Sequence, residues 1–480
     1  MARRWLYLIH RWIGIVTCLL LAMWFLSGIV MIYVPFPSLT QQERLVGLAP
    51  IDWKQMRGIV QPDEWLQQGL DGPVWLGGSA VSASTGRAIR SVTARRAADI
   101  AAAFGKAPIA GIERVERDQW TVAGGFDRYR SLWKVTLKRP DGLILYVAST
   151  TGTVVLDTSR TERFWNWLGS VPHWIYPTVL RQDQPLWRQV ILWTSGTAII
   201  GAVSGMWIGV LRTRLRRRYK GGRISPYRGW QWWHHVMGLF GGTLLVTWIV
   251  SGWLSVDPNR WFTSKGLSDA ARAAYASAGS PPMIDWQRLG RMPQASDVRR
   301  MQMIWTDGVP LLILSHVGRD ATIIDARTLN PAMFERDRLI RAAQRLVPGA
   351  SVEAVNWLTE PDSYWYEAKG RPELPVLRIR FSDPQRTWVY VSPRTGMILN
   401  DVDARRRLYR WLFDGLHRWD FDGLVTRRPL WDIWMWFWLT TGALLSVSGI
   451  VIAIRRLKGR ARKSVVRAAL IPLSAIYERT

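Results

Sequence analysis

The sequence of 480 residues contains a single cysteine, Cys18, and only six histidines. One thiol excludes an intramolecular disulfide, an iron–sulfur cluster held by several thiolates, and the Cys-x-x-Cys-His attachment of a c-type haem. Any metal site in this chain must therefore be built from histidine, carboxylate or methionine side chains.

Charge is absent from four long apolar stretches, which cover residues 12–34, 190–211, 236–256 and 433–454. At a rise of about 1.5 Å per residue, each stretch spans the roughly 30 Å hydrocarbon layer as a helix. The first stretch is too long for a signal-peptide core and no small-residue cleavage site follows it, so we expect it to be retained. The sequence therefore predicts a membrane protein with four transmembrane helices.

Acidic residues are also few, 36 against 64 basic residues, which gives a net charge of +28. The densest basic clusters adjoin the apolar stretches, at the N-terminus, at 212–220 and at 455–463. Membrane topology and anionic lipid headgroups account for such clusters, so we expect no nucleic-acid partner. The positive-inside rule places both termini in the cytoplasm and segments 35–189 and 257–432 outside it.

An internal repeat divides the chain into two parallel halves. In both halves a histidine four residues before a glycine opens the first helix, Ser-Gly follows 17 residues after it, and a second histidine lies 14 residues before a tryptophan. The matching positions are His10 and His234, Ser27-Gly28 and Ser251-Gly252, Ile51-Asp52-Trp53 and Ile284-Asp285-Trp286, His173 and His417, Pro185-Leu186-Trp187 and Pro429-Leu430-Trp431, and Ser204-Gly205 and Ser448-Gly449. Each half also shows two alternating strand patterns, at 132–137 and 143–148 and at 376–381 and 387–391, followed by a turn before a last strand, at 151–153 and at 394–396. These patterns predict small α+β domains with half-exposed sheets.

Four of the six histidines form two repeat-equivalent pairs on opposite membrane faces, His10 with His234 inside and His173 with His417 outside. A pseudo-twofold axis along the bundle would make each pair face across it, as two axial imidazoles of a six-coordinate haem do. His235 aligns with Arg11 and is an alternative to His234. His316 has no repeat partner, and we expect it to be structural.

The outer histidines precede Pro185 and Pro429, where the second helix of each half is expected to begin. Their segments must fold back as interfacial loops or short helices for His173 and His417 to reach a haem.

The chain resembles the PepSY-associated transmembrane proteins, a family that includes ferric-siderophore reductases. The resemblance covers nearly the whole chain and rests on the His-x-x-x-Gly openings, on the strand pairs at 133–137 and 143–155, and on Leu-His-Arg-Trp at 416–419. It implies a four-helix membrane domain, PepSY-like periplasmic domains, b-type haem and reduction of ferric chelates delivered by an outer-membrane receptor. The ligand roles map onto His10, His234, His173 and His417. The first half departs from the motif, with Pro-His-Trp at 172–174.

The expected fold is a four-helix membrane bundle made of two parallel repeats, each with a PepSY-like α+β periplasmic domain. The predicted parts are helix 1 (1–34), periplasmic domain 1 (35–170), outer histidine segment and helix 2 (171–211), basic cytoplasmic loop (212–233), helix 3 (234–256), periplasmic domain 2 (257–414), outer histidine segment and helix 4 (415–454), and basic cytoplasmic tail (455–480).

The functional hypothesis is an inner-membrane oxidoreductase with two b-type haems. A cytoplasmic flavoprotein or a quinol would supply electrons, and a periplasmic Fe(III) chelate such as a ferric siderophore would accept them for iron uptake. Arginines of the periplasmic domains would favour anionic chelates, although surface solubility explains them equally well. No catalytic residue is identified. The alternatives are a non-redox periplasmic binding or regulatory protein and an iron or siderophore permease; the absence of charge in the four apolar stretches argues against the permease.

Overall fold

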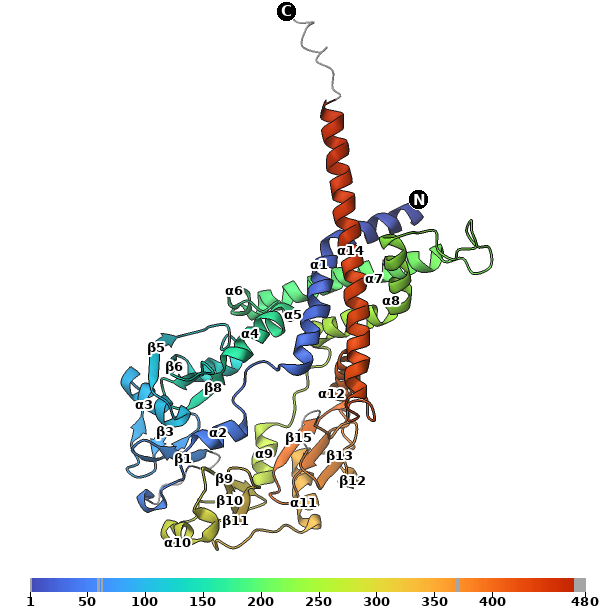
Figure 1. Cartoon of the computed structure of the whole chain (residues 1–480). Coiled ribbons are helices and arrows are strands. Elements are labelled where there is room, and N and C mark those ends of the chain that lie inside the picture. Colours follow the sequence, from blue (N-terminus) through green and yellow to red (C-terminus); the bar gives the residue numbers. More distant parts are fainter. Residues whose placement is uncertain (1, 58–60, 62–63, 368–371, 470–480) are drawn as a thin grey trace, which may run out of the picture. The chain divides into compact units, whose positions relative to one another are not determined.

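The computed structural model describes residues 2–57, 61, 64–367 and 372–469 (Figure 1). Residues 470–480 of the predicted basic tail lie outside this part of the chain. The chain divides into two compact units. The first, which we call the bundle unit, comprises Met1–Pro35, Asn166–Arg260 and Arg410–Thr480; the second, the sheet unit, comprises Phe36–Trp165 and Trp261–Tyr409.

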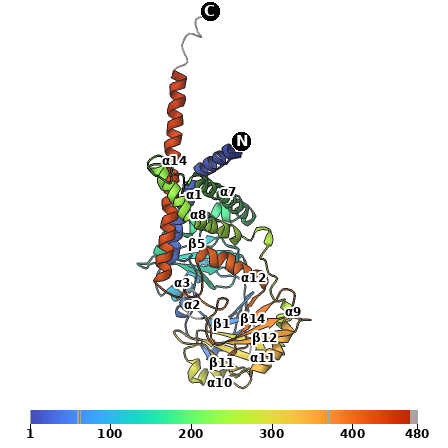
Figure 2. The ribbon, with the colours of Figure 1, turned by 90° about the vertical axis from the view of Figure 1, so that its right-hand side faces the viewer.

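Four long helices make up the bundle unit: α1 (Ala2–Tyr33), α7 (Gln184–Arg212), α8 (Trp230–Ser255) and α14 (Leu430–Ala469). All four are long and apolar enough to span a membrane, which agrees with the four helices predicted from the sequence. Helices α1 and α8 each pack against both α7 and α14, so the four close into a ring (Figures 1 and 2). Phe25, Ala198, Leu245 and Leu439, one from each helix, lie in its apolar core.

Two ends of the bundle can be told apart from the chain connections. We call the loop end the one with the starts of α1 and α8 and the connection 213–229. The sheet end has the end of α1, the start of α7, the end of α8 and the start of α14, where the chain enters or leaves the sheet unit.

Short helices precede the second long helix of each half. They are α4 (Arg160–Leu168), α5 (Ser170–His173) and α6 (Thr178–Arg181) in the first half, and α12 (Ala404–Tyr409), the π-helix η6 (Arg410–Gly415) and α13 (Leu416–Arg418) in the second. Helix α5 packs on α1, and α13 packs on α8. Both outer histidine segments therefore fold back as short helices onto the first long helix of their own half.

Two four-stranded antiparallel sheets repeat the same plan in the sheet unit, each preceded by a helix that packs on it. The first has α3 (Ala94–Gly105) with β5 (Ile109–Val115), β6 (Leu132–Leu137), β7 (Ile144–Ala148) and β8 (Val154–Thr158). The second has α11 (Arg336–Ala343) with β12 (Val352–Leu358), β13 (Val376–Phe381), β14 (Trp388–Val391) and β15 (Ile398–Val402). The predicted strands 132–137 and 376–381 are confirmed with their bounds.

A third sheet joins the two halves. Its seven strands run in the order β11 (Thr322–Asp325), β10 (Val309–Ser315), β9 (Arg300–Thr306), β1 (Trp65–Gly69), β2 (Gly72–Leu76), β3 (Ala80–Ser82) and β4 (Ala88–Ile89). Strand β1 pairs antiparallel with β9, with Leu66 opposite Met301. Most of segments 35–170 and 257–414, which the sequence analysis treats as separate domains, therefore belong to one compact unit and share one sheet.

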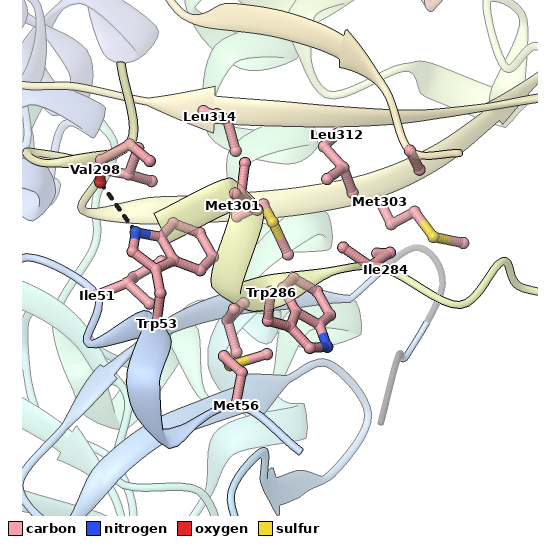
Figure 3. Close-up of a cluster of buried hydrophobic side chains, with 14 of the residues drawn as sticks. Ile51, Trp53, Met56, Ile284, Trp286, Val298, Met301, Met303, Leu312 and Leu314 are labelled. Atoms are coloured by element: carbon pink, nitrogen blue, oxygen red, sulfur yellow. Dashed lines mark hydrogen bonds between the residues drawn. The ribbon is translucent and has the colours of Figure 1, made fainter. Parts of the chain in front are cut away.

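The Ile-Asp-Trp repeat lies beside this shared sheet (Figure 3). Asp52 caps the 3-10 helix η1 (Trp53–Gln55) by accepting from the Lys54 amide, and Asp285 caps α10 (Trp286–Arg291) by accepting from the Arg288 amide. The rings of Trp53 and Trp286 stack with centroids 6.2 Å apart and planes 11° apart. Equivalent residues of the two halves thus pack on each other across a local pseudo-twofold axis.

The remaining elements are short: α2 (Gln41–Gly47), α9 (Asp269–Ala276), and the 3-10 turns η2 (Gly124–Tyr129), η3 (Pro258–Arg260), η4 (Pro293–Ala295) and η5 (Gln344–Leu346).

Candidate functional site: two facing histidine pairs

The first histidine pair lies at the loop end of the bundle. His10 on α1 and His234 on α8 come from helices that occupy opposite positions in the ring. Their imidazole centroids are 6.2 Å apart and the ring planes meet at 40°.

The second pair lies at the sheet end, on the two short fold-back helices. His173 is the last residue of α5, and His417 is in α13. Their centroids are also 6.2 Å apart, with the planes at 76°. The structure therefore brings together both repeat-equivalent pairs, one at each end of the bundle.

In all four histidines, Nδ1 is held by a neighbouring helix. His10 Nδ1 is 3.0 Å from the Gly201 carbonyl oxygen, and His173, His234 and His417 each place Nδ1 3.0 Å from a serine hydroxyl, those of Ser27, Ser448 and Ser251 respectively. The carbonyl oxygens of Trp24 and Trp248 also lie 3.1 and 3.2 Å from Nδ1 of His173 and His417. Because a carbonyl oxygen can only accept, Nδ1 carries the proton where it bonds one, and Nε2 keeps its lone pair. Metal-bound histidines are commonly oriented in this way.

The glycine of each Ser-Gly pair forms a seat for one imidazole. A Cβ added at Gly205 would lie 2.5 Å from Cε1 of His10, and one at Gly252 would lie 3.3 Å from Cε1 of His417. The corresponding distances are 3.6 Å from Gly28 to His173 and 3.5 Å from Gly449 to His234. Each seat belongs to the same half of the chain as its histidine, whereas each ring pair joins the two halves.

The tryptophan of the Pro-Leu-Trp repeat, at the start of α7 and of α14, hydrogen-bonds to the outer histidine segment of the same half. Trp187 Nε1 donates to the Trp174 carbonyl oxygen at 3.0 Å, and Trp431 Nε1 donates to the Arg418 carbonyl oxygen at 3.1 Å. Both carbonyls belong to the residue directly after the outer histidine. Trp248 Nε1 also donates to the His417 carbonyl oxygen at 2.9 Å.

The spacing within each pair can be tested against a metal ion held between two imidazoles. Metal–nitrogen bonds of about 2 Å, with each nitrogen about 1 Å from its ring centroid, put the two centroids roughly 6 Å apart. The observed 6.2 Å in both pairs agrees with this value. Among the described residues, no group of three or more His, Cys, Asp or Glu side chains could hold a metal ion. Two facing imidazoles are the side chains that could serve as the axial ligands of a haem.

The two pairs are far apart along the bundle. On α8, His234 precedes Ser251 by 17 residues, which corresponds to about 26 Å of helix. Aromatic side chains lie between the two levels: Phe25 contacts Trp248 with centroids 5.7 Å apart, and Phe240 stacks on Trp438 at 5.2 Å. Phe25, Trp248 and Trp438 also line a small hollow there, together with Gly241 and Gly442.

His235, the alternative to His234, is fully engaged elsewhere. Its Nδ1 lies 2.9 Å from the Ser225 hydroxyl and its Nε2 lies 3.0 Å from the Gly209 carbonyl oxygen. It therefore fastens the connection 213–229 to α7, and the structure gives no support to it as the partner of His10.

His316 lies in the sheet unit and is buried. It sits 2.9 Å from an Asp297 carboxylate oxygen and 3.0 Å from the Thr322 hydroxyl. Burial, followed by the nearby Arg319 guanidinium, lowers the pKa of His316. These contacts hold His316 within the sheet unit, and its structural role stays a prediction.

Sequence reasoning missed the charged groups around His417. Arg418 pairs with Asp414 at 3.3 Å, and Arg410 lies 3.7 Å from the buried Asp420 carboxylate. Burial raises the pKa of Asp414, and the positive charge of Arg418 offsets only part of this increase. Asp414 lies near His417 because the chain forms the π-helix η6 at this point. No local sequence pattern predicts a π-helix, so this arrangement could not be predicted from the sequence.

Comparison of the chain with protein-family models and with curated proteins found no match. The resemblance to the PepSY-associated proteins therefore stays a prediction from the motifs.

Proposed function

We propose that this chain is a transmembrane electron carrier that holds one b-type haem between His10 and His234 and a second between His173 and His417. The observation that carries the proposal is the pair of histidine sites at opposite ends of the bundle, with equal ring separations and with Nδ1 held in every case.

When bound, the haem would supply one-electron chemistry at an iron whose axial positions are both taken, which suits electron transfer better than ligand binding. The protein's own residues hold and orient the imidazoles. The serine and carbonyl contacts fix Nδ1 and the ring orientation, and a hydrogen bond donated by Nδ1 strengthens the imidazole as a ligand. The glycine seats let the rings approach the helix backbone.

The orientation is part of the proposal. The basic residues beside the loop end support a cytoplasmic position for that end, which would put the sheet unit in the periplasm of a bacterial inner membrane. Outward electron movement is then favoured by about 2.3 kcal/mol per 100 mV for a full crossing. A cytoplasmic flavoprotein or a quinol is the donor.

A periplasmic Fe(III) chelate of the siderophore type is the proposed acceptor, which makes the protein a ferric reductase in iron uptake. Reduction releases the metal because hard oxygen donors hold Fe(III) far better than the softer Fe(II). Delivery of the chelate by an outer-membrane receptor is implied by the family resemblance alone.

The test is the absorption spectrum of the full-length protein purified in mild detergent, oxidised and dithionite-reduced, with a pyridine haemochrome count per chain. We expect two b-type haems in the native protein, and one in His10→Ala and in His417→Ala. His235→Gln is the matched control, since it changes the neighbouring histidine and should keep both haems. A colourless protein from haem-replete cells would refute the proposal and favour a non-redox binding role for the sheet unit.

A further inference from the structure

An arginine without an acidic partner lies on the strand that joins the two halves of the sheet unit. Arg300 on β9 is 8% exposed, and its guanidinium lies over the Trp65 ring at 4.0 Å. Among the described residues, it forms no ion pair and its Nε has no hydrogen-bond partner. Gln67, which is in register with Arg300 on β1, also has a buried side-chain oxygen without a partner. Two facing strands thus leave a donor and an acceptor unused at one place.

A second arginine lies in the same place. Arg44 on α2 is partly buried and donates to the Val154 carbonyl oxygen at 2.7 Å; the Asp157 carboxylate attracts it electrostatically, but Arg44 forms no close ion pair with a described residue. Burial lowers the pKa of Arg300 to about 9, and the neighbouring positive charge of Arg44 adds to the effect. The Tyr129 side chain interacts electrostatically with both guanidinium groups. The three side chains therefore form one cluster, which we call the arginine cluster.

Stacking on Trp65 accounts for only one face of the Arg300 guanidinium. The N–H groups point outward from the edge of the plane, and leaving the buried Nε–H unpaired next to another cation is unfavourable. A planar guanidinium matches the two oxygens of a carboxylate or a similar group, and an anion that binds two guanidinium groups removes their mutual repulsion. The unpaired Nε–H of Arg300 thus fits a ligand that carries negative oxygens.

We propose that the arginine cluster of Arg300, Arg44 and Tyr129 is a binding site for an oxygen-rich anion, and that its ligand is a negatively charged Fe(III) chelate. The identity of the ligand rests on the proposed function, because a ferric reductase needs a place for its acceptor; the presence of the anion site rests on the cluster alone. The aromatic face of Trp65 then serves to hold the Arg300 side chain in place for the ligand.

Binding of gallium(III) citrate to the purified full-length protein, measured by calorimetry, tests the proposal. This chelate is anionic and oxygen-rich and cannot be reduced under these conditions, so binding is measured apart from electron transfer. We expect Arg300→Met to weaken binding by about ten- to a hundred-fold, the effect of losing a charge-assisted contact. Arg95→Met, at an exposed arginine of the same unit, should leave it unchanged.

Thermal unfolding of the same variants separates binding from folding. An unpaired buried charge is costly, so Arg300→Met should unfold at the native temperature or above it when no ligand is present. If Arg300→Met proves less stable, Arg44→Met, which leaves β9 untouched, must still weaken binding. Unchanged affinity in both variants overturns the proposal.

Control ligands and the haem count separate this site from the proposed function. Iron-free citrate or inorganic phosphate binding as tightly as the gallium chelate would overturn the assignment to a chelate. A protein with two haems that does not bind gallium citrate would lose the anion site and keep its electron-transfer role. A protein that binds gallium citrate at Arg300 but has no haem would keep the site and lose that role.

Discussion

Gly205 on α7 gives the sharpest test of the imidazole seats. In Gly205→Ala the new methyl group would lie 2.5 Å from Cε1 and 2.9 Å from Nδ1 of His10, where ordinary contact begins at 3.4 Å. The ring must therefore withdraw by close to an ångström, which strains or breaks the 3.0 Å contact between Nδ1 and the Gly201 carbonyl oxygen. Overpacking of this kind costs about 1–3 kcal/mol. A loss of about 2 kcal/mol corresponds to roughly thirty-fold weaker retention of a haem at this pair.

Gly449→Ala is the matched control, since its methyl group would meet His234, the other member of the same pair, at an ordinary 3.5 Å. Both variants should fold, because alanine in place of glycine stabilises a helix interior by up to about 1 kcal/mol. The assay is the pyridine haemochrome count per chain before and after incubation with a haem-scavenging apoprotein, alongside thermal unfolding. We expect Gly205→Ala to lose one haem and Gly449→Ala to keep two. Equal haem retention by the two variants would refute the role assigned to the seat.

Three further predictions test other parts of the structure. His234→Ala should lose one haem, because His234 faces its repeat partner, whereas His235→Gln should keep two haems and weaken only the attachment of connection 213–229; equal losses would contradict this assignment. Trp187→Phe removes an indole donor from the fold-back segment at a cost of about 1 kcal/mol, so amide hydrogen exchange there should speed up, which Trp193→Phe at an exposed site of the same helix should not cause. Burial, then nearby glutamates, raise the pKa of Asp157 to about 6, so its protonated form favours folding at low pH and that stability is lost as pH rises through 6. Asp157→Asn should therefore unfold at a higher temperature than the native protein above pH 6, by the equivalent of about 1 kcal/mol after allowance for partial exposure, and show no gain near pH 4.

The four helices and the two histidine pairs could be predicted because both depend on patterns that lie along the chain. The length of a charge-free stretch sets a membrane span, and equal offsets between repeats place equivalent residues at equivalent levels. The strands 132–137 and 376–381 could be predicted for the same reason, since their apolar positions alternate locally.

The partners of the imidazoles could not be predicted, because which helix face meets which ring depends on packing. The Ser-Gly pairs were visible as part of the repeat, but nothing in the sequence showed that Gly205 lies beside His10 from another helix. Likewise, His234 and His235 are adjacent and chemically identical, and only the contacts of His235 with Ser225 and Gly209 separate their roles.

The seven-stranded sheet that joins the two halves could not be predicted from the sequence either. Strand β1 reads Trp-Leu-Gln-Gln-Gly, too short and too polar for a strong strand signal, and its partner β9 lies more than two hundred residues further on. Treating the two segments as separate domains was the natural interpretation of a repeat, since each half contains its own four-stranded sheet.

The pairing of β1 with β9 sets an order on biosynthesis. Leu66 cannot pair until Met301 has been synthesised, roughly 235 residues later by their numbering. Helices α7 and α8 are made and must be inserted into the membrane during this interval. At a synthesis rate of about 5–20 residues per second, the edge of β1 stays open for roughly 10–50 s in every molecule made. An open edge strand invites pairing with another chain, so a nascent copy is exposed to aggregation throughout this interval. The β1–β9 pairing thus holds the two halves of the finished sheet unit together, and its formation is the step of assembly most exposed to aggregation.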